Sequence, residues 1–257
     1  MGLGRWLPSP LLRGSALLHP AMVLLAAVRP SWWPWILTGM VADHAAIVAG
    51  GLWPRSTWIG PNLRRLPPGR AAGAVALSFD DGPDPEITPG VLDLLAAAGA
   101  RASFFWPALR AAAQPELVQA AVVAGHRVEN HSRSHPAHFA FLPPRAMTVE
   151  IEEAQRILEA LTGRRPRCFR APAGIRAPWT QPLLERAGLR LVSWTRRGFD
   201  TTDRSAERVT RRLLDGLAEG DILLLHDRGS AVVLEVLERV LSELDRRGWA
   251  GVGVGED

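Results

Sequence analysis

From residue 75 onward, short apolar runs alternate with longer stretches of helical periodicity, and this alternation limits the folds open to the chain. The runs have the length of buried strands; they cover residues 75–79, 102–106, 127–129, 167–170, 189–194 and 221–225. Helices are predicted between and after them, over residues 89–98, 115–124, 148–161, 205–217 and 231–244. Strands that alternate with helices form parallel sheets, so we predict an α/β domain with a parallel sheet or barrel and helices outside.

The first 70 residues have a different composition, with two apolar segments over about residues 16–28 and 32–53. The second segment has about the roughly 20 residues needed to cross a bilayer. Tryptophans lie near both of its ends, as they do at membrane interfaces; they are Trp32, Trp33, Trp35, Trp53 and Trp58. We therefore expect residues 1–70 to form a short apolar helical segment that attaches the chain to a membrane, and residues 71–257 to form the main domain.

Asp43 and His44 count against a simple span, because charge at the bilayer centre is costly. A soluble helical appendage packed on the main domain is the alternative. A cleaved signal peptide fits poorly, since the apolar content continues well past the region of cleavage. If both segments insert as a hairpin, the arginines on its two outer flanks belong on the cytoplasmic side. They are Arg5 and Arg13 before the first segment, and those from Arg55 to Arg70 after the second. If only the second segment spans, these arginines do not decide the side.

Charge and cysteine content exclude other classes of function. All 30 basic side chains are arginine, and the formal net charge is only +4. The arginines are scattered and often lie beside acids, as in Glu207-Arg208, which indicates solvated surface and no nucleic-acid partner. Cys168 is the sole cysteine, so the chain has no internal disulfide and no cysteine-based metal site. The oligomeric state stays open.

Polar side chains follow five of the six predicted strands at their carboxyl ends. They are Asp80, Asp81, His131, His135, Arg170, Asp200 and His226. In a barrel of parallel strands the carboxyl ends share one rim, where the loops converge and active sites are built. We therefore expect these side chains to meet at one site.

The histidines and the aspartate pair suggest a metal site. His131 and His135 have the i, i+4 spacing of two ligands on one helical turn. With one carboxylate they leave positions open for water and substrate, as catalytic zinc sites require. A divalent cation would also relieve the repulsion between Asp80 and Asp81, so that one ligates and the other acts as a base. Taken alone, the pair is better explained by a turn before Gly82, and the histidine spacing also arises by chance.

Arg170 and His226 suit supporting roles in such a site. Arg170 suits the task of holding a buried carboxylate ionised and oriented. A surface arginine is the alternative, and the place of Arg170 at a strand end before a Pro-x-Gly turn counts against it. His226 follows a buried strand directly, and an imidazole that titrates near neutral pH suits a general acid. A hydrogen-bonded core histidine is the alternative. His126 and His138 are not assigned as ligands.

With these residues in place, the sequence resembles the polysaccharide deacetylase family, the NodB-homology carbohydrate esterases, over about residues 75–251. Four ordered motifs carry the resemblance: Ser-Phe-Asp-Asp-Gly-Pro at 78–83, Asn-His-Ser-Arg-Ser-His at 130–135, Arg-Ala-Pro-Ala-Gly at 170–174 and Leu-Leu-His at 224–226. The resemblance implies a distorted (β/α) barrel with fewer than eight regular strands. It also implies a metal-dependent hydrolase that removes N-acetyl, or less often O-acetyl, groups from a sugar or polysaccharide and releases acetate.

The resemblance assigns roles residue by residue. It implies Asp80 as catalytic base, oriented by Arg170, and His226 as general acid. It implies Asp81, His131 and His135 as ligands of a divalent metal, usually zinc in this family. Leu224 would line the acetate pocket, and Pro172 would contact substrate. Residues 71–257 would then be the catalytic domain, and its partner an acetylated glycan.

One motif departs from the family pattern. Where the family often has Asp-x-x-Asp-Trp, this chain has Arg-Gly-Phe-Asp-Thr at residues 197–201, so only Asp200 is kept. We expect Asp200 to support the acid–base network through Arg170. The changed wall of the groove weighs against the usual polymers, and the apolar N-terminal segments keep open a lipid-linked glycan or a non-sugar amide as substrate. A silent glycan-binding module or a membrane scaffold would need none of the catalytic residues.

Overall fold

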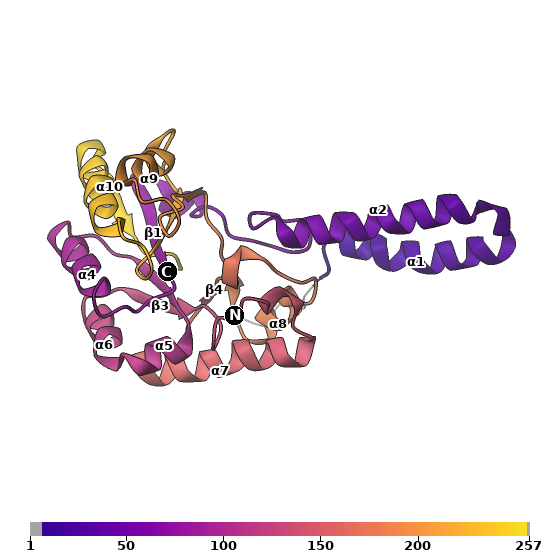
Figure 1. Ribbon diagram of the computed structural model, residues 1–257, viewed down its shortest axis with the longest axis horizontal. Helices are drawn as coiled ribbons and strands as arrows, with labels where there is room; N and C mark the ends of the chain where they lie inside the picture. The colour runs from indigo at the N-terminus through magenta and orange to yellow at the C-terminus, as the bar shows by residue number, and fades with distance from the viewer. Residues whose placement is uncertain (1–6, 256–257) are drawn as a thin grey trace.

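The strands of the computed structural model, which describes residues 7–255, form one parallel sheet (Figure 1). Their order is β5-β4-β3-β2-β1-β7-β6, and β8 pairs with the first residues of β1. The strands are β1 Ala74–Asp80, β2 Ser103–Trp106, β3 Arg127–Asn130, β4 Cys168–Phe169, β5 Arg190–Leu191, β6 Arg196–Arg197, β7 Ile222–His226 and β8 Ala250–Val252. Three of them have two residues each, so the predicted distorted barrel is confirmed as an irregular one.

Helices surround the outer face of this sheet (Figure 1). They are α3 Pro68–Ala71, α4 Thr88–Ala97, α5 Ala108–Ala113, α6 Pro115–Val123, α7 Pro144–Thr162, α8 Thr180–Arg186, α9 Ala206–Leu214 and α10 Val233–Arg247, with the 3-10 turns η2 Phe139–Phe141 and η3 Pro172–Gly174. The five predicted helices are present with shifted ends. Glycines in the left-handed region follow all five, as helix C-termini favour; they are Gly99, Gly125, Gly163, Gly216 and Gly248.

Alternation along the central strands places two of the three hydrophobic clusters on opposite faces of the sheet. Val75, Leu77 and Phe79 of β1 point outward and pack against the helices. Ala76 of β1 and Leu224 of β7 face inward, in a smaller cluster inside the barrel. Because successive side chains in a strand point to opposite faces, Asp80 and His226 continue this inner face at the carboxyl ends. The pattern therefore brings the candidate site to the inside of the rim.

Residues 63–66, here called the strap, cross between β5 and the beginning of β7. Leu63 N donates to Leu191 O at 3.0 Å, and Ser193 N donates to Leu63 O at 2.9 Å. At the other end, Leu66 N donates to Gly220 O at 2.8 Å. The strap therefore gives backbone partners to both sides of the opening in the sheet.

A hairpin of two long helices extends away from this body (Figure 1). It consists of α1 Pro10–Val28 and α2 Trp33–Leu52, joined through the turn η1 Pro30–Trp32. Both helices are long and apolar enough to cross a membrane, judged by length and composition. Many of their large apolar side chains are exposed, and Leu17, Leu24 and Trp35 are examples. Arg5, one of the flanking arginines, lies outside the described residues.

Polar side chains meet between the two helices of the hairpin. Ser15 Oγ donates to Asp43 Oδ2 at 2.7 Å. His19 Nδ1 donates to the Ser15 carbonyl at 2.8 Å, and His44 Nδ1 to the Met40 carbonyl at 2.9 Å. The two imidazole rings lie edge to face, with centroids 5.1 Å apart. Asp43, which counts against a simple span, thus accepts a hydrogen bond from α1, whereas His44 is hydrogen-bonded within its own helix α2.

The base of the hairpin packs directly against the loop that follows β4. Arg176 N donates to Gly51 O at 3.1 Å, and the Arg176 guanidinium donates to Ser56 O. A Cβ on Gly51 would lie 2.5 Å from the Arg176 carbonyl oxygen, so only glycine allows this approach. The hairpin is therefore joined to the part of the body that carries Arg170.

Several predicted boundaries are wrong. The run at 167–170 yields only Cys168–Phe169, and the run at 189–194 only Arg190–Leu191, because the following residues pair with the strap or turn inward. The short elements α5, α8 and β6 were not predicted. The glycine-rich C-terminal stretch contains the short strand β8, which ends at Val252.

Candidate active site

Asp80 and His226 lie side by side at the ends of β1 and β7. They are paired in the parallel register, and both are buried. Partners in a parallel ladder project to the same face of the sheet. A carboxylate and an imidazole thus share the inner rim, as expected from the sequence.

Arg170 holds the Asp80 carboxylate from the opposite side of the barrel. Its Nη1 donates to Asp80 Oδ1 at 2.6 Å, and its Nη2 donates to Ser78 Oγ and to the Ser193 carbonyl, both at 3.0 Å. The guanidinium also lies 4.1 Å from the centroid of the Phe105 ring. A buried charge pair with these extra contacts fixes the orientation of the carboxylate.

Asp81, His131 and His135 converge beside this pair. His135 Nε2 lies 3.1 Å and His131 Nε2 3.7 Å from Asp81 Oδ1. His131 Nε2 is also 4.0 Å from Asp80 Oδ2. Candidate ligand atoms of the three residues all lie within 4.8 Å of one another. The two aspartates are therefore divided between different partners, Asp80 with Arg170 and Asp81 with the histidines.

The protonation states in this cluster suit a cation. His131 Nδ1 lies 2.7 Å from the Arg170 carbonyl, which can only accept, so the proton is on Nδ1 and the Nε2 lone pair is free. Burial, with a contribution from His135, lowers the pKa of His131 to about 4, against the opposite effect of Asp80 and Asp81. Its imidazole is thus neutral at pH 7.

The Asp81 carboxylate is ionised. Burial tends to raise its pKa, but the nearby histidines and Arg110 outweigh this and keep the pKa below its usual value. Its Oδ1 is buried and accepts no hydrogen bond from the described residues. Two imidazoles, those of His131 and His135, and an ionised carboxylate with an unsatisfied oxygen fit a divalent cation.

Asp200 contacts His226 directly. His226 Nδ1 and its backbone N donate to the two carboxylate oxygens, both at 2.9 Å. Burial lowers the pKa of His226, but the hydrogen bond and the charge of Asp200, with smaller effects of Asp80 and Asp81, raise it overall above its ordinary value. The expected link from Asp200 through Arg170 is wrong, because the Arg170 donors go to Asp80, Ser78 and Ser193.

The remaining predicted residues lie around these groups. Leu224 is buried on the inner face, two residues before His226. Pro172 begins η3, two residues after Arg170, and is also buried. His138 is exposed, and His126 is buried with Nδ1 accepting from Ala102 N, so neither joins the cluster.

Asp227 holds in place the turn that follows β1, residues 81–83, here called the aspartate loop, and sequence reasoning missed this. Its carboxylate accepts from Gly82 N at 3.1 Å, Thr88 Oγ at 2.8 Å and Trp106 Nε1 at 3.0 Å. A Cβ on Gly82 would lie 2.2 Å from the carboxylate, so the glycine allows this contact. Burial raises the pKa of Asp227 to about 7, although the three donors oppose this. Its position after His226 was the only available signal.

The loops of the rim are strained. Among the described residues, five that are not glycine have a left-handed backbone: Asp81, Ser132, His135, Ala173 and Phe199. Arg110 Nη1 donates to the Asp81 carbonyl at 2.7 Å and supports one of them. Such conformations cost about 1–3 kcal/mol each and persist where surrounding contacts hold them, often at active sites.

Residues 197–201, where the sequence departs from the family motif, form a wall that contains an arginine packed against aromatic rings. The Arg197 guanidinium lies 5.4 Å from the ring centroid of Trp194 and 4.9 Å from that of Phe199. The Phe199 side chain is 47% exposed. An arginine between two aromatic rings therefore stands where the family motif often places an aspartate.

Comparison with known proteins fits this geometry. Residues 69–192 match the profile of a family described as polysaccharide deacetylase. A peptidoglycan-N-acetylglucosamine deacetylase of Bacillus cereus is 30% identical over 78% of this chain and 91% of its own length. A chitooligosaccharide deacetylase of Bradyrhizobium is 37% identical over 60% of this chain and 70% of its own. A family 4 carbohydrate esterase from Streptomyces lividans, solved with acetate, is 32% identical, with a TM-score of 0.66 over 70% of this chain and 92% of that one.

Proposed function

Because the chain belongs to the polysaccharide deacetylase family and is a carbohydrate deacetylase, we propose that it removes the N-acetyl group from N-acetylglucosamine units of a glycan. The relatives from Bacillus cereus and Bradyrhizobium are named for peptidoglycan N-acetylglucosamine and for chitooligosaccharides. The observation that carries the proposal is the separation of roles at the rim: Asp80 is held by Arg170, while Asp81 faces two histidines.

Asp80 is the proposed catalytic base. Its carboxylate is buried, fixed by Arg170 at 2.6 Å and within 4.0 Å of His131 Nε2. The carboxylate, held in this orientation, can take a proton from a water beside the acetyl carbon. Arg170 acts as a positioning residue, because its donors fix the carboxylate on β1.

Asp81, His131 and His135 would hold a divalent cation, and we propose zinc. The donor set of two imidazoles and one carboxylate is typical of catalytic zinc and leaves coordination positions open. When bound, the cation would polarise the acetyl carbonyl and lower the pKa of the attacking water. Ser132 Oγ accepts from His135 N at 3.0 Å and helps to fix the loop between the two histidines.

His226 is the proposed general acid. Nδ1 donates to Asp200, which leaves Nε2 to carry the proton that is transferred. The raised pKa keeps this imidazolium populated near neutral pH. Transfer of that proton to the departing sugar nitrogen completes hydrolysis, and Leu224 and Pro172 would contact the acetyl group and the sugar.

The α1–α2 hairpin is the proposed membrane anchor. A helix of 19 or 20 residues spans about 28–30 Å, which matches the hydrocarbon core of a bilayer. Exposed tryptophans lie at both ends of α2, as at membrane interfaces. Recovery of the full chain in membranes after a carbonate wash tests this; release into the supernatant would contradict it.

A lipid-linked glycan is the second candidate substrate. It is favoured by the contact of the hairpin base with Arg176, which places the membrane anchor beside the loop that carries Arg170. A soluble oligosaccharide and the same sugar on a polyprenyl phosphate would give different rates if the anchor presents the site to the membrane.

The deciding experiment measures acetate release from N-acetylglucosamine oligomers, with and without a chelator, beside Asp80→Asn. We expect release that the chelator abolishes and that falls by a factor of about 10³ or more in the variant. The variant should still bind its metal. A metal-replete Asp80→Asn enzyme with nearly native turnover would overturn the assignment. No release by metal-loaded wild type would redirect the proposal to the lipid-linked sugar.

A further inference from the structure

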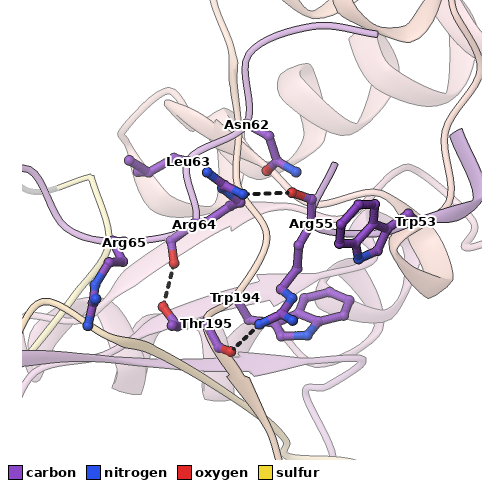
Figure 2. Close-up of a pocket in the computed structure, with 8 residues that line it drawn as sticks. All are labelled: Trp53, Arg55, Asn62, Leu63, Arg64, Arg65, Trp194 and Thr195. Atoms are coloured by element: carbon purple, nitrogen blue, oxygen red, sulfur yellow. Dashed lines mark hydrogen bonds between the residues drawn. The ribbon is translucent and has the colours of Figure 1, made fainter. Parts of the chain in front are cut away.

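A pocket of about 460 Å³ lies where the hairpin meets the catalytic body (Figure 2). Three segments that are distant in sequence line it: the residues after α2, the strap with its preceding residue, and the turn between β5 and β6. Figure 2 shows Arg55, Arg64 and Arg65 around it, with Trp53 and Trp194 on one side. The pocket is separate from the Asp80 cluster.

The pocket carries positive charge that the described residues leave uncompensated. Arg65 is paired with the buried Asp221. In contrast, Arg55 Nη1 donates to the Thr195 carbonyl at 2.9 Å, and Arg64 Nη1 to the Arg55 carbonyl at 3.3 Å. In residues 7–255, no carboxylate lines the pocket or forms an ion pair with Arg55 or Arg64. Two guanidinium groups with spare donors are the residues that bind phosphate.

Side-chain and backbone hydrogen bonds hold these arginines in place. Asn62 Nδ2 donates to the carbonyls of Pro54 and Ser56, at 2.9 and 3.1 Å, and so fixes the turn that carries Arg55. Thr195 Oγ donates to the Arg64 carbonyl, across the pocket (Figure 2). The three segments are thus tied together without a ligand, which lowers the entropic cost of binding one.

The position of the pocket along the hairpin identifies the source of the phosphate. Trp32, Trp33 and Trp35 lie at the far end of the hairpin, and Trp53 and Trp58 at its base, all with exposed side chains. The 20 residues of α2 separate the two groups by about 30 Å, the thickness of the hydrocarbon core. If the hairpin inserts as proposed above, the residues just beyond Trp53 lie at the level of the lipid phosphates.

We propose that this pocket binds the phosphate group of an anionic membrane lipid through Arg55 and Arg64. Trp194 connects it to the catalytic rim, since its ring lines the pocket and its centroid lies 6.0 Å from the Arg170 guanidinium. A bound lipid therefore fixes the base of the hairpin, and with it the rim, at the membrane surface. The proposal rests on the insertion of the hairpin and is independent of which acetylated sugar is the substrate.

The test uses the full chain in phosphatidylcholine vesicles with a small fraction of brominated phosphatidic acid, or of brominated phosphatidylcholine as the zwitterionic reference. Bromine quenches tryptophans at the pocket when the labelled lipid occupies it. We expect excess quenching by phosphatidic acid, with an apparent affinity that falls roughly tenfold or more in Arg55→Gln/Arg64→Gln. The matched control Arg145→Gln/Arg190→Gln removes two exposed arginines elsewhere on the body and should retain the excess.

Three results would overturn the proposal. The first is equal quenching by the two lipids, and the second is an unchanged excess in Arg55→Gln/Arg64→Gln or an equal loss in the control. The third is saturable binding of inorganic phosphate in pure phosphatidylcholine vesicles without excess quenching, which would assign the pocket to a soluble phosphate. Acetate release from soluble oligosaccharides, measured on the same samples, separates these failures from a failure of the deacetylase assignment.

Discussion

The hairpin and the rim of the candidate active site each bring together one aspartate and two histidines. In the hairpin these are His19, Asp43 and His44, and at the rim Asp81, His131 and His135. In both clusters candidate ligand atoms of the three residues lie within 4.8 Å of one another. Residue types and distances alone therefore do not distinguish them.

Their surroundings differ. In the hairpin, His19 and His44 donate to carbonyl groups four residues earlier on their own regular helices, and Ser15 satisfies Asp43. At the rim, Asp81 and His135 have left-handed backbones, and a second aspartate, an arginine and a histidine lie close by. A strained backbone and nearby acid and base groups therefore distinguish the candidate active site from the hairpin cluster. The hairpin cluster has the contacts of a polar clamp between two helices.

The largest expected effect separates the two clusters. His131→Ala removes a buried neutral imidazole that faces Asp81, so we expect loss of stoichiometric metal and a fall in turnover by a factor of about 10³ or more. His19→Ala, the matched change in the hairpin, should leave both unchanged. Metal content after dialysis and acetate release measure the two variants. Retained metal in His131→Ala, or lost metal in His19→Ala, would reverse the comparison.

The second effect concerns His226, the proposed general acid, which has no counterpart in the hairpin cluster. Asp200→Asn removes the charge that raises the pKa of His226, so this pKa falls. Since the general acid must be protonated, the alkaline limb of kcat/KM moves to lower pH, and turnover at pH 8 falls by a factor of about 10–100. A pH–rate profile checks this. If the alkaline limb does not move in Asp200→Asn, titration of His226 does not produce that limb.

The third effect tests how far the stability of the rim depends on the buried Asp227 carboxylate. Asp227→Ala leaves buried donors of Gly82, Thr88 and Trp106 without an acceptor, so we expect a loss of about 2–3 kcal/mol in the free energy of unfolding. Chemical denaturation measures it, with Asp93→Ala on the exposed face of α4 as control. Equal stability of the two variants would show that the aspartate loop holds its shape without Asp227.

The smallest effect belongs to the hairpin. Asp43→Asn weakens the contact with Ser15 and should destabilise the hairpin by about 0.6 kcal/mol, the average for polar contacts between membrane helices. Thermal unfolding in detergent is the measurement, and turnover of soluble oligosaccharides should not change. A drop in turnover comparable with that of His131→Ala would mean that the two clusters act together.

The parts of the fold that could be predicted are those with a local signal. β1 and β7 are continuous buried runs that end in charged residues, so both the strands and the polar groups at their ends were visible in the sequence. The motif residues Asp80, Asp81, His131, His135, Arg170 and His226 are all brought to one rim, as expected. Their catalytic roles remain predictions.

The rest depends on contacts between residues far apart in the chain. β6 has two residues and exists because it pairs with β7, and the strap has no apolar pattern of its own. The contact of Asp200 with His226 follows from the approach of two loops, which motif order does not reveal. Asp227 was missed for the same reason, since its three partners come from β2, the aspartate loop and α4.

The strap has a consequence for any shortened form of this protein. An open strand edge presents unpaired backbone groups and invites association with other chains. A chain that began at residue 71 would lose Leu63 and Leu66, and with them the backbone partners of Leu191, Ser193 and Gly220. Such a fragment would keep every proposed catalytic residue and still expose an aggregation-prone edge, whereas a chain that began at Pro54 would keep that edge covered.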